Sequence, residues 1–258
     1  MTGGVWALDL ACRIAAVGVL VGALEQWHIR ERFAAGGVLG PPPAARSDVR
    51  SRMLLLLVAA QVIAALIVIT VGVASPPGWV ALCLLVIAFT SLRVLRRVGG
   101  DGAEQMASIV LIATALVAPA FPGDVRVALA VAFIAAQAVL AYLTSGVAKF
   151  VSPVWRDGTG LRGILSTVDH GTPAIGRWLG RHPGLSVAAS WATIGFECGF
   201  VLALVLPPPL AGAVLGVGLA FHAACAALMG LNSFLWAFPA TYPCVWVANE
   251  AVRGVLFG

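Results

Sequence analysis

The sequence predicts an all-α polytopic membrane protein, a bundle of seven or eight transmembrane helices. Of its 258 residues, 60% are hydrophobic and only 10% are charged, whereas soluble domains carry about a quarter charged residues. Several apolar stretches reach the roughly 20 residues that a helix needs to cross a bilayer. These spans and short loops use up the chain, so we expect one transmembrane domain over residues 1–258 and no separate soluble domain.

Helix-stopping residues divide the chain into its expected spans. Proline and paired glycines rarely lie inside a helix, and Pro76-Pro77-Gly78 and Pro207-Pro208-Pro209 separate apolar stretches. The fourth stretch is short. Pro239 and Pro243 interrupt the last one, which is either a kinked eighth span or a re-entrant segment. The expected spans cover residues 5–24, 53–74, 79–95, 105–120, 125–147, 185–206, 210–229 and 231–252.

Short helices that do not span the membrane are expected between spans five and six. Ser152-Pro153 and Thr172-Pro173 each place an N-cap residue before a proline at the first helical position. In the second of these helices Arg177 and Arg181 lie one turn apart beside Trp178. This composition is typical of a helix that lies in the membrane interface.

The basic residues report topology. The net charge of +5 arises in loops, so it indicates contact with the lipid bilayer and gives no reason to expect nucleic acid as a partner. Thirteen of the 16 basic residues follow spans one, three and five, whereas Arg126 and Arg253 lie on the opposite side. The positive-inside rule therefore puts the end of span five in the cytoplasm of a multi-pass protein of the cell membrane.

Ionisable residues inside spans cost about 2.5–3.5 kcal/mol each on insertion scales, so each needs a physical reason. Asp9 and Arg13 are spaced i, i+4 and can pair on one helix face. Glu197 and His222 lie at similar depth in spans six and seven, where they could hydrogen-bond across the bundle. Such a contact would be either a structural clasp between two helices or part of a proton relay or polar ligand site.

Lys149 is the only lysine in the chain, and it lies where span five ends. One interpretation is a snorkelling side chain that marks the end of the helix. The other is a catalytic base, because a lysine in a dry site can lose its proton near neutral pH and an arginine cannot.

The sequence assigns no metal and no redox centre. The five cysteines are isolated, with no CxxC pair. His222, Cys225 and Met229 share a helix face and are soft ligands, but this spacing is common in helices of small residues. No haem, flavin or iron–sulfur motif is present in the sequence.

Several motifs together resemble the membrane region of the vitamin K-dependent gamma-carboxylases, which is also found in bacteria as the horizontally transferred transmembrane (HTTM) family. The central match is a "GxxK…W..G" pattern, and the other matches follow the family's order along the chain. The matching residues are Arg13-Ile14, Gly37-Val38-Leu39, Ser145 to Phe150 with Lys149, Trp155 and Gly158, Glu197, Phe221-His222, Met229 to Phe234 with Asn232, and Tyr242-Pro243.

The resemblance implies a helix bundle whose cavity accepts a quinone or hydroquinone, with Lys149 as the base. Glu197 and His222 would be the other catalytic residues, placed around Lys149. Further contacts to the cofactor would come from Arg13, Trp155, Asn232 and Tyr242.

This chain also departs from the carboxylases. We expect no counterpart of their large extra-membrane domain, and Ala148 stands at the position that resembles a second lysine of the animal enzymes. The family places the first loop on the lumenal side, opposite to the arginine count, so the orientation stays open.

The sequence is compatible with three functions. The first is a membrane protein whose cavity binds a quinone-like or lipid-like molecule and supports carboxylating or oxidative modification of a peptide. The second is a non-enzymatic scaffold that binds a membrane partner through Gly212 and Gly216, a GxxxG motif that allows close helix approach. The third is a quinone-linked redox subunit of the DoxX kind.

Overall fold

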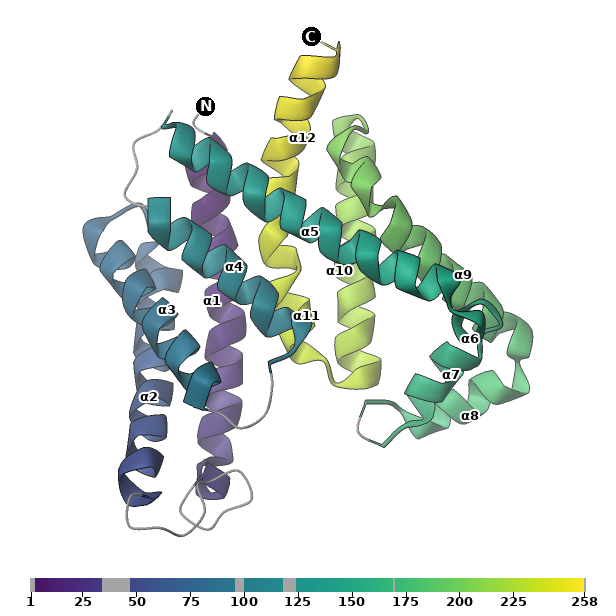
Figure 1. The fold of residues 1–258 in the computed structure, drawn as a ribbon, viewed down its shortest axis with the longest axis horizontal. Helices are drawn as coiled ribbons and strands as arrows, with labels where there is room; N and C mark the ends of the chain where they lie inside the picture. The colour runs from purple at the N-terminus through teal and green to yellow at the C-terminus, as the bar shows by residue number, and fades with distance from the viewer. Residues whose placement is uncertain (1–2, 34–46, 96–99, 118–123, 169, 258) are drawn as a thin grey trace. The chain divides into compact units, whose positions relative to one another are not determined.

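The computed structural model describes residues 3–33, 47–95, 100–117, 124–168 and 170–257, and the side chains of 47–51 are not described (Figure 1). These residues form helices and no strand, as the all-α prediction requires. The Gly37-Val38-Leu39 motif lies outside the described residues. The elements are α1 (Gly3–His28), η1 (Arg30–Phe33), α2 (Ser47–Val71), α3 (Pro76–Leu95), α4 (Gly102–Val117), α5 (Val125–Val151), α6 (Pro153–Arg156), α7 (Thr159–Ser166), α8 (Pro173–Arg181), α9 (Pro183–Gly199), η2 (Phe200–Leu204), α10 (Pro208–Met229), α11 (Asn232–Ala237), η3 (Pro239–Thr241) and α12 (Tyr242–Phe257).

Six helical segments of the described chain are long and apolar enough to cross a membrane, so the chain has the character of a multi-pass membrane protein. Two expected spans differ from this group. The fourth is the 16-residue helix α4, and the last is broken at Pro239 into α11, η3 and the 16-residue helix α12. The six segments are Gly3–His28, Arg52–Val71, Pro76–Leu95, Val125–Val151, Pro183–Leu204 and Pro208–Met229.

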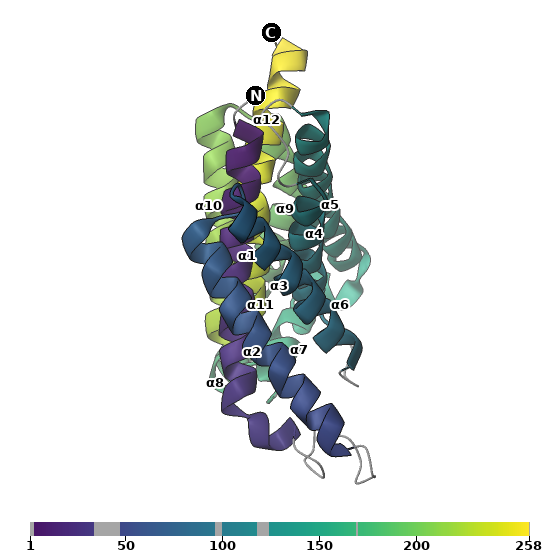
Figure 2. The same ribbon diagram turned by 90° about the vertical axis from the view of Figure 1, so that its left-hand side faces the viewer.

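The chain divides into two compact units, Met1–Val131 and Ala132–Gly258, here called unit 1 and unit 2. In unit 1, α2 and α3 run side by side and α1 packs along α2 (Figure 2). The turn between α2 and α3 is tight: Gly72 has a φ of 77°, and a Cβ on Gly78 would overlap the Gly72 carbonyl oxygen. The prediction of one domain stays a prediction.

The predicted Asp9–Arg13 pair is confirmed in unit 1. Arg13 Nε lies 2.7 Å from Asp9 Oδ2, and Arg13 Nη1 donates to the carbonyl oxygen of Ile69 at 2.5 Å. Asp9 Oδ1 accepts a hydrogen bond from the backbone N–H of Val73 at 2.7 Å. The pair therefore satisfies backbone groups at the end of α2, which helices leave without intrahelical partners.

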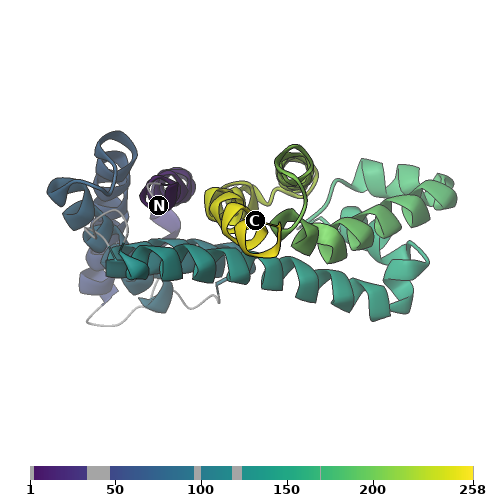
Figure 3. The same ribbon diagram turned by 90° about the horizontal axis from the view of Figure 1, so that it is seen from above.

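Unit 2 holds an aromatic core. Tyr142 of α5 stacks on Phe200 of η2 with ring centroids 3.9 Å apart, and Tyr242 and Val245 of α12 are buried in the same cluster. Helix α12 packs against α10 and against η2, and α10 and α12 can be followed from above in Figure 3.

Short helices α6, α7 and α8 lie where the sequence predicts non-spanning pieces, between α5 and α9. Ser152 and Thr172 occupy the N-cap positions and each precedes a proline, as predicted, but neither side chain caps its helix. The Thr172 hydroxyl donates instead to the Leu228 carbonyl oxygen at 2.7 Å, which joins α8 to the end of α10. The location of these helices in the membrane interface stays a prediction.

Candidate functional site

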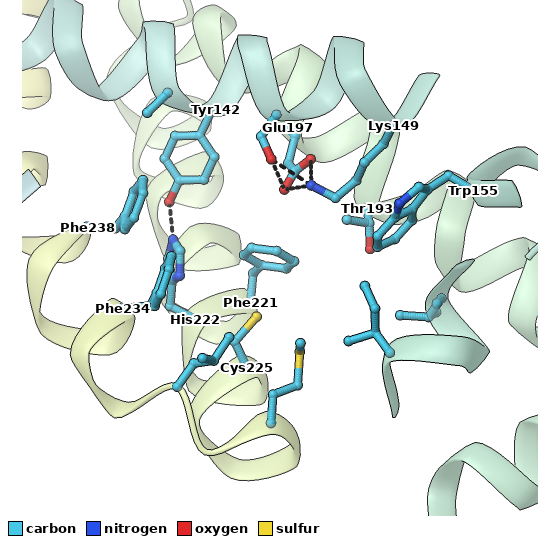
Figure 4. Close-up of a pocket in the computed structure, with 16 residues that line it drawn as sticks. Tyr142, Lys149, Trp155, Thr193, Glu197, Phe221, His222, Cys225, Phe234 and Phe238 are labelled. Atoms are coloured by element: carbon cyan, nitrogen blue, oxygen red, sulfur yellow. Dashed lines mark hydrogen bonds and ion pairs between the residues drawn. The ribbon is translucent and has the colours of Figure 1, made fainter. Parts of the chain in front are cut away.

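Unit 2 contains a cavity of about 320 Å³ between α5, α9 and α10 and the short helices α6, α7 and α11 (Figure 4). Apolar and aromatic side chains make up most of its wall, and a few ionisable groups interrupt them. Its lining residues are Ala141, Tyr142, Ser145, Lys149, Trp155, Leu161, Ile164, Thr193, Glu197, Phe221, His222, Cys225, Met229, Leu231, Phe234 and Phe238.

Lys149 and Glu197 form an ion pair in the wall of this cavity. Lys149 Nζ lies 2.9 Å from Oε1 and 2.8 Å from Oε2 of Glu197, and it donates to Ser145 Oγ at 2.6 Å. Ser145 Oγ in turn lies 3.3 Å from Glu197 Oε1. These contacts use all three ammonium donors, so the lysine does not snorkel away from Glu197.

The geometry of the pair follows from the local sequence of α5. Ser145 and Lys149 are four residues apart, which places both on one face of the helix. A Cβ on Gly146, between them, would come within 2.8 Å of the backbone nitrogen and Sγ of Cys198 and 3.0 Å of Glu197 Cβ. Glycine at this position therefore lets α9 approach α5 closely enough for Glu197 to meet Lys149.

The segment after α5 folds back over the pair. Lys149 Nζ lies 5.1 Å from the centre of the Trp155 ring, within the range of a cation–π contact. Gly158 has a φ of 79°, and its carbonyl oxygen accepts a hydrogen bond from Ser186 Oγ at 2.7 Å. A Cβ on Gly158 would come within 2.7 Å of the Val187 nitrogen, so the turn needs glycine for conformation and for space.

Asp157 stabilises the same turn from the exposed side. Its Oδ1 accepts hydrogen bonds from the backbone N–H of Thr159 at 2.8 Å and from the Thr159 hydroxyl at 2.6 Å. These bonds favour the charged carboxylate and lower its pKa below the usual value.

His222 belongs to a second polar group in the wall. Its Nε2 lies 2.7 Å from the Tyr142 hydroxyl, which lies 2.8 Å from the Tyr242 hydroxyl. The His222 ring stacks on Phe238 with centroids 4.6 Å apart, and Phe234 lies in a further stacked position at 6.3 Å. Figure 4 shows the imidazole below the Tyr142 hydroxyl, beside Phe234 and Phe238.

The expected hydrogen bond between Glu197 and His222 is wrong. Both side chains line the cavity, but Glu197 bonds Lys149 and Ser145, whereas His222 bonds Tyr142. The reason is that α5 supplies a hydrogen-bond partner to each of them: Lys149 to Glu197, and Tyr142 to His222.

The seven predicted site residues do not all lie at the same place in the structure. Lys149, Trp155, Glu197 and His222 line one cavity, and Tyr242 contacts it only through Tyr142. The other two lie elsewhere. Arg13 bonds Asp9 and the Ile69 carbonyl within unit 1. Asn232 is exposed at the start of α11 and is not among the lining residues.

Tyr142 and Ser145 were not singled out as site residues from the sequence. A signal was nevertheless present, because the chain has only two tyrosines and one of them lies inside the apolar stretch of span five. Tyr142, Ser145 and Lys149 follow each other at intervals of three and four, so they share the face of α5 that lines the cavity.

Comparison with family models, with curated proteins and with solved structures gives no match to this chain. Within the part of the chain that the structure describes, no three His, Cys, Asp or Glu side chains cluster in a way that could hold a metal ion. The function must therefore be argued from the cavity of unit 2 and its two polar groups.

Proposed function

We propose that unit 2 binds a quinone-like or lipid-like molecule in its cavity and that the Lys149–Glu197 pair takes a proton from it. The observation that carries this proposal is the position of the only lysine of the chain. It is ion-paired with a buried glutamate in the wall of an otherwise apolar cavity, inside a unit built of apolar helices.

The size and lining of the cavity support an apolar ligand with a small polar group. Small-molecule pockets usually have volumes of about 300–1,000 Å³, apolar walls and a few placed polar side chains. At about 320 Å³ the cavity suits a ring-sized group, and any longer apolar tail would extend outside it. Phe221, Phe234 and Phe238 offer aromatic surface to such a ring.

The pair has the capacity to accept one proton. In its ionised form Lys149 is fully protonated and Glu197 is not, so an arriving proton adds to the pair as a whole. A ligand hydroxyl beside the pair would give its proton to the carboxylate, or to the amine after the amine has passed a proton to Glu197. An arginine at position 149 could keep the ion pair but could not take part in this exchange.

The family resemblance extends the proposal to a reaction. It favours a membrane protein of the HTTM and vitamin K-dependent carboxylase-like kind, in which the deprotonated quinol supports modification of a peptide. The support for this step is the motif around Ser145, Lys149, Trp155 and Gly158: the first three residues line the cavity, and Gly158 forms the turn that follows Trp155.

Ligand content and binding test the proposal. The full chain, purified in nanodiscs from its native membrane, is expected to release a quinone or lipid-like molecule on solvent extraction, identified by mass spectrometry. It should also bind 2-methyl-1,4-naphthoquinol, kept reduced under anaerobic conditions, with release of a proton to the pair. Lys149→Arg removes only the route through the amine, whereas the double variant Lys149→Arg/Glu197→Gln, which has no proton acceptor left in the pair, should bind the probe without the proton transfer.

Arg156→Lys provides the control, because Arg156 is exposed and is not among the residues that line the cavity. Absence of any extracted ligand, together with no binding of the naphthoquinol, would remove the proposal.

A second candidate is a scaffold that binds a membrane partner through α10. A Cβ on Gly216 would meet no atom within 4 Å, and a Cβ on Gly212 would meet only Trp246 at an ordinary 3.6 Å. Gly212→Leu and Gly216→Leu should then release a co-purifying membrane protein while the cavity keeps its ligand. Retention of every co-purifying protein by these variants argues against this role.

A further inference from the structure

We infer that His222 carries its proton on Nδ1 and that this N–H is the donor by which the cavity recognises a hydrogen-bond-accepting oxygen of its ligand. The inference rests on the proposed function for the existence of a ligand in the cavity. It adds that one ligand atom must be a hydrogen-bond acceptor. Tyr142 and Tyr242 are positioning residues, because their hydrogen bonds determine which nitrogen of His222 carries the proton.

The direction of the hydrogen-bond chain begins at Tyr242. Its hydroxyl is buried, and the Tyr142 hydroxyl, at 2.8 Å, is its hydrogen-bond partner within the described part of the chain. A buried hydroxyl that does not donate loses a hydrogen bond that water would have supplied. Tyr242 therefore donates to the oxygen of Tyr142.

The Tyr142 hydroxyl then has one hydrogen to donate and one remaining neighbour that can accept it. Its oxygen receives the Tyr242 hydrogen, so its own hydrogen points to Nε2 of His222 at 2.7 Å. Hydroxyl groups rotate to suit their partners, and this arrangement is the one that satisfies both tyrosines at once. The chain runs from Tyr242 to Tyr142 to His222.

The histidine tautomer follows from that direction. A neutral imidazole has one donor nitrogen and one acceptor nitrogen. Glu197 is bonded to Lys149 and Ser145, so no carboxylate is bonded to His222 to favour an imidazolium among the aromatic rings. With Nε2 as acceptor, the proton is on Nδ1.

This donor is left without a partner. Nδ1 of His222 is buried and makes no hydrogen bond with any described residue, although the side chain lines the cavity. An unpaired buried N–H is unfavourable, and native proteins rarely retain one. An acceptor oxygen on the ligand would complete its bonding.

The two polar groups of the wall then have opposite roles. The Lys149–Glu197 pair accepts a proton, and His222 donates a hydrogen bond without giving its proton up. A ligand that matches both has a hydroxyl at one place and an accepting oxygen, such as a carbonyl or phenolate, at another. A purely hydrocarbon ligand matches neither group, and one with a lone ammonium group offers no acceptor to His222.

Nitrogen NMR tests the tautomer without any ligand. The full chain, ring-labelled with ¹⁵N at histidine and placed in phosphatidylcholine nanodiscs, should show a pyrrole-type Nδ1 and a pyridine-type Nε2 for His222. The other three histidines are removed from the comparison by subtracting the spectrum of His222→Gln. Tyr142→Phe should turn the single tautomer into a mixture.

Thr144→Val is the matched control for the loss of a hydroxyl from α5, because Thr144 is exposed and bonds the Leu140 carbonyl. It should leave the His222 signals unchanged. A protonated Nε2 in the unaltered protein, or a tautomer that Tyr142→Phe does not alter, overturns the inference.

Probe binding tests the donor itself. The amide nitrogen of asparagine can replace Nδ1 of a histidine, whereas that of glutamine replaces Nε2. His222→Gln should therefore weaken binding of 2-methyl-1,4-naphthoquinone about tenfold, as loss of one buried hydrogen bond would. His222→Asn should retain more of the affinity, and 2-methylnaphthalene, which lacks the oxygens, should bind all three proteins alike.

The outcomes separate this inference from the proposed function. Naphthoquinone binding that is equal in the Gln and Asn variants leaves the cavity function standing and overturns the donor role of Nδ1. Failure of the unaltered protein to bind the naphthoquinone overturns the proposed ligand class and, with it, the recognition of an oxygen by His222.

Discussion

Lys149 Nζ lies within 3 Å of both carboxylate oxygens of Glu197, across the contact between α5 and α9. The two side chains are 17% and 5% exposed, so water contributes little to either charge. Each residue is therefore the main source of stabilisation for the charge of the other. Removal of one partner leaves a buried, uncompensated group, which is more unfavourable than removal of both.

A double-mutant cycle measures this dependence. Lys149→Met or Glu197→Leu alone should each lower the free energy of unfolding by about 3–5 kcal/mol, the usual effect of breaking a buried pair. The double variant should be less destabilised than the sum of the two, because neither charge remains. Denaturant unfolding in detergent, followed by tryptophan fluorescence, gives the three values. Additive effects would show that the two side chains do not depend on each other.

Gly146 sets the distance between the helices that carry this pair. Gly146→Ala adds a Cβ within 2.8 Å of the Cys198 backbone, so α9 must move away from α5. We expect weaker binding of the naphthoquinol probe and a smaller coupling energy between Lys149 and Glu197. Gly195→Ala in α9 is the control, because its Cβ would meet nothing within 4 Å. Equal effects of the two alanines would contradict this role of Gly146.

Gly158 offers a second comparison of two glycines. Gly158→Ala forces a residue with a side chain to adopt a φ of 79° and places its Cβ against Val187, so we expect a loss of about 1–3 kcal/mol in stability. Gly163→Ala, in the exposed part of α7 with open space around it, should be neutral or stabilise by about 0.4–1 kcal/mol. Unfolding in detergent checks the sign of both changes, and a stable Gly158→Ala protein would show that the turn is not constrained.

The turn at Asp157 should respond to acid. Hydrogen bonds from Thr159 lower the pKa of this carboxyl in the folded chain, so its stabilising contribution is present above the unfolded value. The contribution should begin to decrease as the pH falls below about 4, the ordinary pKa of aspartate. It should be lost once the pH has fallen through the lower pKa that Asp157 has in the folded chain. Hydrogen exchange of the Thr159 amide should therefore speed up at low pH, beyond the intrinsic pH effect, and Asp157→Asn should remove that excess.

The helical class could be predicted from the sequence because composition and apolar length decide it directly. The same reasoning placed Asp9 with Arg13, since i, i+4 spacing on one helix fixes their distance. The number of spans was harder to predict from the sequence. The lengths of α4 and α12 depend on where each helix begins and ends, and local signals locate those ends only within a few residues.

Long-range partners were harder to predict. The sequence indicated that Lys149, Glu197 and His222 were unusual, but a pairing between helices depends on their rotation, which no single helix determines. Glu197 contacts Lys149 because of the close approach at Gly146, and His222 contacts Tyr142 because both face the same cavity. Tyr142 is difficult to identify from the sequence, because an aromatic residue in an apolar stretch usually indicates core packing.

The Asp9–Arg13 pair makes a last prediction, for unit 1. Arg13 bonds Asp9 through Nε and the Ile69 carbonyl through Nη1, and a lysine cannot make both contacts in this geometry. Arg13→Lys and Arg13→Met should therefore both destabilise the protein, the second by about 1.5–3 kcal/mol, as expected for hydrogen bonds to a charged group.

Gly72 adds an independent check of the same contact. A Cβ on Gly72 would overlap the Arg13 guanidinium and come within 2.5 Å of Asp9 Oδ1, so Gly72→Ala should destabilise less once Arg13→Met has opened the space. Arg30→Met is the control, because Arg30 is exposed and its contacts with described residues are local, to the carbonyl and the ring of Trp27; the expected change is within about 0.5 kcal/mol. If Arg13→Met and Arg30→Met shift the unfolding midpoint equally, the pair does not hold the end of α2. A smaller loss for Gly72→Ala in the Arg13→Met background would show that the arginine, the aspartate and the turn act as one contact.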